Sequence, residues 1–236
     1  MSPTALATWS RAVIMAGGAD EKWTSLGGPG RRHFAAIGGE RVIERQVRQL
    51  RERGVNDIVI VAPDLLGYRV PGAVRVGPMA AGWGREALSS RDAWAPTGRT
   101  ILVYGDTLFT DAAMDTVVGF EPHDWQLFGR FGASSIKRYG EIFAISFWPE
   151  HHEQWKGALA EAFSLKARGI TRRAGCWEGF RVLGGARGAE VSEHRRYPAL
   201  MTEIDDATDD FDTPAELATL LDAWRQAGLL REVVPV

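Results

Sequence analysis

The chain has 236 residues, of which 45% are hydrophobic and 25% charged, and its formal net charge is −2. This composition is ordinary for a globular protein, and we expect a single domain over residues 1–236. The low net charge gives no electrostatic reason to expect nucleic acid or an anionic membrane surface as a partner. No run of about 18 apolar residues occurs, so no transmembrane helix is expected.

The cysteine content and the first ten residues narrow the possible classes of protein further. Cys176 is the only cysteine, which excludes an internal disulfide and a cysteine-built zinc site. We expect its thiol to pack as a small apolar group. Residues 1–10 lack the basic start and apolar core of a signal peptide, so the expected location is cytoplasmic. No feature of the sequence indicates an oligomeric state.

The first half of the chain alternates between apolar runs and helical patterns. Residues 12–15 form a short apolar run that predicts a buried strand. Residues 16–35 are expected to be an irregular loop, because the Gly-Gly-Pro-Gly stretch at 27–30 disfavours a helix. Residues 41–53 predict a helix with one mainly apolar face, ended by Gly54. The other predicted elements are strands at 57–62, about 73–76 and 100–104, and helices at about 84–94 and 111–118.

The second half is less regular. It predicts strands at 125–131, 141–148 and 199–204, and helices at 150–163 and 214–227. The last helix has Pro214 in its first turn and Thr213 or Asp212 as its N-cap. Strands that alternate with helices predict an α/β fold, with three layers around a mostly parallel central sheet. Such sheets bind ligands beyond the carboxyl ends of their strands.

A glycine turn follows the first predicted strand. Ala16-Gly17-Gly18 lets the backbone approach a ligand closely, and exposed backbone amides there suit an anion. Basic residues follow at Lys22 and at Arg31-Arg32, which would neutralise the phosphates of a nucleotide. Each cation taken alone is also typical of an ordinary surface, and chemistry does not separate Arg31 from Arg32.

Carboxylates supply a candidate metal site. Asp106 follows a buried strand and a glycine, where it suits Mg²⁺ held against phosphates. The alternative is that Asp106 caps the following helix. Further acids precede the last helix at Asp205, Asp206, Asp209, Asp210 and Asp212. Most of these are expected to be solvated and to favour the helix N-terminus, while one of them completes the Mg²⁺ site with Asp106.

Several common motifs are absent. The glycine turn does not match G-x-G-x-x-G, and the sequence contains no G-x-x-x-x-G-K-[ST] and no G-x-S-x-G. The pair His151-His152 does not belong to an H-E-x-x-H motif and is expected to be exposed and polar. A dinucleotide fingerprint, a P-loop, a serine-hydrolase elbow and a zincin site are therefore not supported.

Taken in order, these segments resemble the nucleotidyltransferases with a glycosyltransferase-A-like fold, which include sugar-phosphate nucleotidylyltransferases and molybdenum-cofactor nucleotidyltransferases. Residues 15–22 stand in place of the opening L-A-G/A-G-x-G-x-R loop, and 31–34 in place of the P-K element. Residues 77–82 resemble a G-P-L-A-G segment, and 104–106 resemble the strand-end G-D. Residues 210–214 resemble the late D-x-x-T-P element, and in that register Asp210 rather than Asp212 is the second metal ligand.

The resemblance implies a Rossmann-like sheet and Mg²⁺-dependent transfer of a nucleoside monophosphate from an NTP to a phosphorylated acceptor, with release of pyrophosphate. The N-terminal half would bind the nucleotide and residues 120–205 the acceptor. The implied nucleotide-binding residues are Ala16, Gly17, Gly18, Gly77 and Pro78. The implied catalytic residues are Lys22 and Arg32, and the implied metal ligands are Asp106 and Asp210.

The sequence departs from the pattern of this family in the opening loop. Asp20 replaces a glycine, Lys22 an arginine, and Arg31-Arg32 the P-K pair. Two alternatives therefore stay open. One is a glycosyltransferase of the same fold that uses a nucleotide sugar, although Tyr104 stands where a second carboxylate would favour it. The other is a non-catalytic nucleotide-binding protein. The nucleotide base, the acceptor and the pathway are not indicated.

Overall fold

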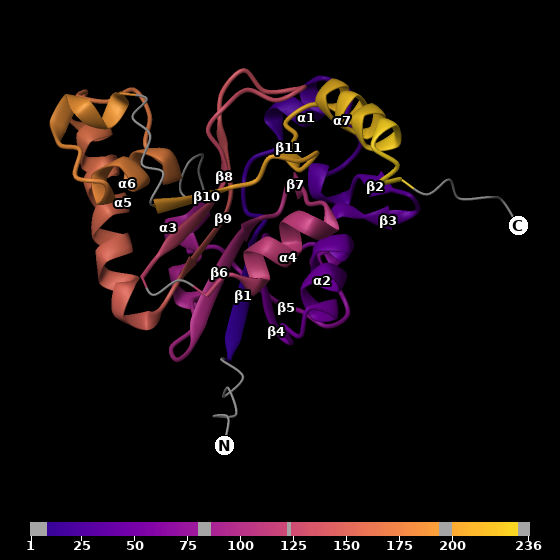
Figure 1. Cartoon of the computed structure of the whole chain (residues 1–236), viewed down its shortest axis with the longest axis horizontal. Helices are drawn as coiled ribbons and strands as arrows, with labels where there is room; N and C mark the ends of the chain where they lie inside the picture. The colour runs from indigo at the N-terminus through magenta and orange to yellow at the C-terminus, as the bar shows by residue number, and fades with distance from the viewer. Residues whose placement is uncertain (1–8, 80–85, 122–123, 194–199, 231–236) are drawn as a thin grey trace, which may run out of the picture.

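The computed structural model describes residues 9–79, 86–121, 124–193 and 200–230 (Figure 1). Within them, seven strands form one central sheet in the order β5-β4-β1-β6-β9-β8-β10. The strands are β1 (Ser10–Met15), β4 (Asp57–Val61), β5 (Val74–Val76), β6 (Arg99–Tyr104), β8 (Gln126–Arg130), β9 (Glu141–Phe147) and β10 (Met201–Glu203). Only β9 pairs antiparallel with its neighbours in this sheet. The predicted α/β fold with a mostly parallel sheet is confirmed.

Strand residues alternate between two buried faces, which makes the fold three-layered. Ala12 and Ile14 of β1 belong to a core covered by α2 (Val42–Glu52) and α4 (Asp111–Gly119). Val13 of β1 belongs to a second core on the opposite face, under α5 (His152–Ala167) and α6 (Cys176–Leu183). Successive strand side chains point to opposite faces, so a strand covered on both sides is apolar throughout. Of the described helices, none is long and apolar enough to span a bilayer.

A third apolar cluster lies between α1 (Glu21–Ser25) and α7 (Pro214–Gln226), which lie side by side above the sheet in Figure 1. Trp23 of α1 (Glu21–Ser25) is buried and its ring lies 5.7 Å from that of Phe211. Leu220 and Trp224 of α7 (Pro214–Gln226) belong to the same cluster, as do Ile37, Val42 and Leu108. Burial of these large side chains fixes the segment after β1 against the segment before α7.

The structure corrects several details of the predicted elements. The expected loop at 16–35 contains the short helix α1 and a 3-10 turn, η1 (Arg32–Phe34), although 27–30 is indeed not helical. The helix expected at 84–94 is described only as α3 (Glu86–Ser89), followed by a 3-10 turn over Arg91–Ala93. The sequence analysis missed α6, whose segment has glycines on both sides, and two short antiparallel ladders of two strands each. Cys176 is buried, as expected.

Candidate active site

The candidate site lies at the carboxyl ends of β1 and β6. These two strands pair in parallel, and β4 lies on the other side of β1. From β1 the chain first adds β4 and β5 on one side of β1, and then crosses back to add β6 on the other side. Such a point, where the strand order reverses, is where open α/β sheets bind ligands. The residues that end these strands are Ala16–Gly18 and Gly105–Asp106, so sequence and topology select the same place.

The glycine turn is tightly packed on the sheet. The Ala16 amide donates to the Val61 carbonyl oxygen at 2.9 Å, which extends the β1–β4 ladder by one bond. A Cβ built on Gly17 would lie 3.4 Å from the Cβ of Pro78, so the structure brings these two predicted nucleotide-binding residues together. Gly77 is exposed beside Pro78, at the end of β5. This distance is an ordinary contact and Gly17 has no positive φ, so neither packing nor backbone conformation within the chain itself requires glycine at this position.

Arg31 and Arg32 have different surroundings, which sequence alone did not distinguish. Arg31 Nη1 donates to the Gly18 carbonyl at 2.9 Å and to Asp20 Oδ2 at 2.7 Å. It clamps the glycine turn, and it neutralises the acid that departs from the family pattern. Arg32 instead lies among the carboxylates, with Nη2 2.8 Å from Asp106 Oδ2 and Nη1 2.6 Å from Asp212 Oδ1.

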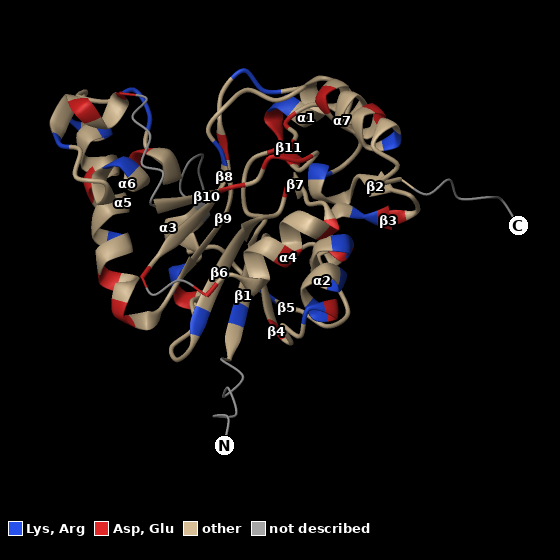
Figure 2. Ribbon diagram, viewed as in Figure 1, with Lys and Arg blue, Asp and Glu red and all other residues tan. Residues whose placement is uncertain are grey.

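Three carboxylates converge beside Arg32. Asp106, Asp210 and Asp212 each place one oxygen within 4.8 Å of the others, and we call them the carboxylate cluster. The short strand β7 (Thr107–Leu108) follows Asp106 directly and pairs antiparallel with β11 (Asp209–Asp210). This ladder brings two segments about a hundred positions apart in sequence to one point. Figure 2 shows the acidic ribbon, in red, gathered at β11 and β7 just below α1.

Two lysines join the cluster. Lys137, in the loop between β8 and β9, has its Nζ 3.3 Å from Asp210 Oδ2, 3.4 Å from Asp212 Oδ2 and 3.5 Å from Glu216 Oε1. Lys22 Nζ lies 2.9 Å from Asp212 Oδ2, and its side chain is 69% exposed, so it remains within reach of a ligand. The sequence analysis missed Lys137. The loop that follows a parallel strand lies at the ligand edge, but the direction of β8 was not known from sequence.

The electrostatics of the cluster are strongly uneven. Burial, together with the charge of Glu141, raises the pKa of Asp210 well above its usual value. Burial likewise raises the pKa of Glu141 to about 7. Burial opposes ionisation of Asp212 too, but the hydrogen bond from Lys22 and the charge of Lys137 lower its pKa to about 2. Asp212 is therefore firmly ionised, whereas the surroundings of Asp210 disfavour its ionised form.

The carboxylate cluster fits a divalent cation. The Asp210 Oδ1 atom is buried and has no hydrogen-bond partner among the described residues. Burying an unpaired carboxylate oxygen is costly unless a cation or a donor meets it. Carboxylate oxygens are the ligands that Mg²⁺ prefers, usually one or two of them with phosphate and water completing the set. Asp106, Asp210 and Asp212 are the residues that would hold it.

The acidic segment before α7 is mostly not a solvated loop, which corrects the expectation for it. Asp209 is 1% exposed and pairs with Arg130 at 3.0 Å, and Asp206 hydrogen-bonds to the Thr110 hydroxyl. Asp205 is the exposed member of the series. The N-cap of α4 is Thr110, so Asp106 is not needed to cap that helix.

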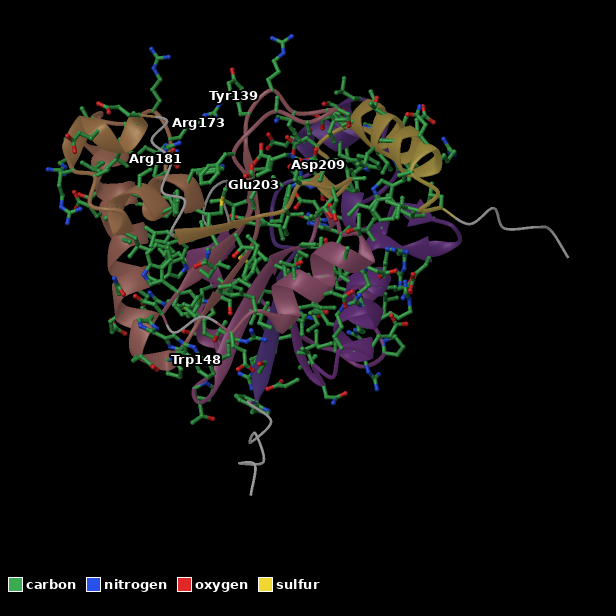
Figure 3. The ribbon with its side chains drawn as sticks, viewed as in Figure 1. Tyr139, Trp148, Arg173, Arg181, Glu203 and Asp209 are labelled. Atoms are coloured by element: carbon green, nitrogen blue, oxygen red, sulfur yellow. The ribbon has the colours of Figure 1, made fainter. Side chains whose placement is uncertain are left out.

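Aromatic side chains lie at the carboxyl ends of β6 and β8, on the side of the second core. Tyr104 ends β6 and Phe131 follows β8, and both are half-buried against the second core together with Trp177 of α6. Figure 3 places Tyr139, Glu203 and Asp209 toward the upper end of the sheet and Trp148 at the opposite end. Arg172 and Arg173, which lie within the segment assigned to the acceptor, are exposed, and 195–196 lie outside the described residues.

The histidine pair at 151–152 is not simply exposed, contrary to expectation. His151 Nε2 lies 2.8 Å from Asp124 Oδ1. His152 packs its ring against Trp94 and Phe147, with centroids 5.3 and 5.4 Å away. Both histidines come after the end of β9. Because β9 runs antiparallel to β6, this end lies beside the start of β6, at the edge of the sheet opposite the carboxylate cluster.

A buried histidine beneath the site gives the first testable prediction. His33 is 1% exposed, and burial together with the charge of Arg32 lowers its pKa to about 3. The Nδ1 atom of the neutral ring shares a hydrogen bond with the Tyr68 hydroxyl, 2.8 Å away. Below pH 6.5 the unfolded chain binds a proton here that the folded chain refuses. This contribution to stability should therefore fall by up to about 1.4 kcal/mol per pH unit between pH 6.5 and 3.

The measurement is urea unfolding of the wild type and of His33→Gln at pH 7, 6 and 5. Glu141 acts in the opposite sense, because its raised pKa makes the folded state take up a proton as the pH falls from 7. The difference between the two proteins isolates His33. Identical pH slopes for both proteins would contradict a neutral buried His33.

No profile of a known protein family and no curated protein matches this sequence. Solved structures do. One is a Bacillus anthracis protein provisionally named a glucose-1-phosphate thymidylyltransferase (TM-score 0.61, 15% identity, 91% of this chain and 95% of that one). Another is the inositol-1-phosphate CTP transferase of T. maritima (TM-score 0.58, 13% identity, 98% and 99%). A third is the CTP:phosphocholine cytidylyltransferase of Streptococcus pneumoniae (TM-score 0.57, 15% identity, 90% and 98%). The chain therefore has the α/β fold of these nucleotidyltransferases, as its motifs predicted.

Proposed function

We propose that this protein is an enzyme that transfers a nucleoside monophosphate from an NTP to a phosphorylated small molecule, with Mg²⁺ as cofactor. The observation that carries the proposal is the carboxylate cluster with Arg32, Lys22 and Lys137 around it, at the switch point of the sheet. The fold supports the reaction class, because the structures it resembles are named for transfer from a nucleotide to a sugar phosphate or another phosphorylated alcohol.

The chemistry is an in-line displacement. An oxygen of the acceptor phosphate attacks the α-phosphorus of the NTP. The new P–O bond forms as the bond to the bridging oxygen breaks, and pyrophosphate leaves with that electron pair. No covalent intermediate with the protein is needed, so positioning and charge stabilisation supply most of the catalysis. A bound Mg²⁺ would neutralise phosphate charge and orient the reacting group.

The protein's own residues divide this work. Gly17 and Gly18 let the backbone come close to the nucleotide, and Arg31 keeps their turn in shape. Lys22 and Arg32 hold the charge of the triphosphate and of the leaving pyrophosphate. Lys137 comes from the acceptor half and brings a positive charge to the same carboxylates, where the phosphates of donor and acceptor would meet.

The experiment that tests the proposal measures pyrophosphate release with each NTP and Mg²⁺, with and without a panel of sugar, polyol and amino-alcohol phosphates. We expect release with one base only when an acceptor is present. In parallel, an NTP at about 100 times its Kd should stabilise the fold by about 2.7 kcal/mol. Hydrolysis of a nucleotide sugar without pyrophosphate release would indicate a glycosyltransferase. Stabilisation by nucleotides without any turnover would indicate a binding protein.

A further inference from the structure

Arg32 occupies the carboxylates that a divalent cation would need. Its guanidinium bridges Asp106 and Asp212, with N–O distances of 2.8 and 2.6 Å. The side chain is 13% exposed, so water does little to screen these contacts. An arginine and a divalent cation in the same place would repel each other and draw on the same negative charge. Binding of one therefore opposes binding of the other.

The hold on Arg32 is incomplete. Its Nε atom is buried without a hydrogen-bond partner among the described residues, at 3.5 Å from Asp20 Oδ1. The residue stands on the three-residue turn η1, outside the central sheet. Its neighbour Arg31 is held differently, by a backbone carbonyl and by Asp20. Arg32 Nε thus has an ion-pair contact with Asp20 but no hydrogen bond.

We propose that Arg32 is a displaceable counter-ion of the carboxylate cluster. It neutralises Asp106 and Asp212 in the nucleotide-free protein and moves to the phosphates of the incoming nucleotide. The divalent cation then enters with the nucleotide rather than before it. This inference rests on the proposed function and describes how the same site admits its metal.

The charges of the site support this exchange. The described ion pairs join five carboxylates to four cations. Departure of Arg32 from the carboxylates makes this set more negative by one charge, which favours entry of a cation. The planar guanidinium also binds phosphate oxygens with two parallel hydrogen bonds, so the arginine exchanges two carboxylates, each held through one nitrogen, for one bidentate phosphate partner.

The test is the affinity of the full chain for Mn²⁺ without nucleotide, measured by titration calorimetry or by the electron paramagnetic resonance of free Mn²⁺. Arg32→Gln should bind Mn²⁺ at least about tenfold more tightly than the wild type, because a charge within contact distance has been removed. Arg31→Gln is the matched control. It removes the same charge one residue away without freeing Asp106 or Asp212, and its affinity should stay within about threefold of the wild type.

Two further variants keep the result unambiguous. Arg32→Lys retains the charge but loses the fork that bridges two carboxylates, so its Mn²⁺ affinity should be intermediate; it serves also if Arg32→Gln does not fold. Adding Asp106→Asn to either variant should abolish the gain. A non-hydrolysable NTP analogue should tighten Mn²⁺ binding more in the wild type than in Arg32→Gln.

Unchanged Mn²⁺ affinity in the Arg32 variants would overturn the inference, and so would an equal gain in Arg31→Gln, which would mean a bulk charge effect. A gain that survives Asp106→Asn would place the cation elsewhere and would overturn it too. These readouts do not depend on turnover. If the wild type releases pyrophosphate while these affinities do not change, the counter-ion role fails and the proposed function stands.

Discussion

Replacing Asp106 with asparagine is expected to lower kcat by about 10²- to 10³-fold while the protein stays folded. Asp106 carries one of the three charges proposed to hold the metal, and its amide replacement keeps the shape but not the charge. The fold should tolerate the change, because the amide oxygen can still accept a hydrogen bond from Arg32. The measurement is the rate of pyrophosphate release at saturating NTP and Mg²⁺, with circular dichroism to verify folding.

The matched control for this experiment is Asp205→Asn. Asp205 belongs to the same acidic series but is exposed and lies outside the carboxylate cluster. Its variant should retain wild-type activity within about twofold, since an exposed charge beyond the first contacts is largely screened. Full activity in Asp106→Asn would remove Asp106 from the metal site and would favour a binding role without turnover.

Replacing Arg130 with methionine is expected to reduce the free energy of unfolding by about 3–5 kcal/mol. Arg130 is 8% exposed, pairs with the nearly inaccessible Asp209 at 3.0 Å and donates to the carbonyl oxygens of Asp206 and Thr208. Its loss leaves an uncompensated buried carboxylate and two backbone acceptors without their donor. Urea or thermal unfolding of the purified variant measures the effect.

Two companion variants separate the causes of this loss. Adding Asp209→Asn to Arg130→Met removes the uncompensated charge and should recover part of the stability. Arg225→Met, on the exposed face of α7, should change stability by no more than about 0.5 kcal/mol, because surface ion pairs contribute little. Asp209→Asn alone is measured as well. If the double variant loses as much unfolding free energy as the two single variants added together, Arg130 and Asp209 do not act as a pair.

Local patterns in the sequence were sufficient for most of the sheet. The strands at 12–15, 57–62 and 100–104 were found within two residues of their ends, because a strand buried on both faces must be apolar throughout. The helix α2 was found because its buried side chains recur with the helical period. The short elements α1, β7 and β11 were missed, since their formation depends on contacts with distant segments rather than on local propensity.

The residues of the candidate site were likewise predicted only in part from the sequence. The glycine turn, Lys22 and Asp106 were recognisable from the sequence, because residues at the ends of parallel strands reach one edge of the sheet whatever the rest of the chain does. The sequence did not separate Arg31 from Arg32, or Asp210 from Asp212. In the structure, Arg31 binds the glycine turn and Arg32 binds the carboxylates. Asp210 and Asp212 both lie close enough to Asp106 to share one metal ion with it.

The sequence by itself thus determined the sheet, the edge at which we propose that a ligand binds, and several of the charged residues that reach that edge. Only the tertiary structure decided which charges meet there. The β7–β11 ladder brings Asp210 to Asp106, and the β8–β9 loop supplies Lys137. The physical reason is that charge compensation acts through space. A carboxylate one hundred residues away in sequence contributes as much to the charge of the site as an adjacent one, and no local sequence pattern predicts that it will be there.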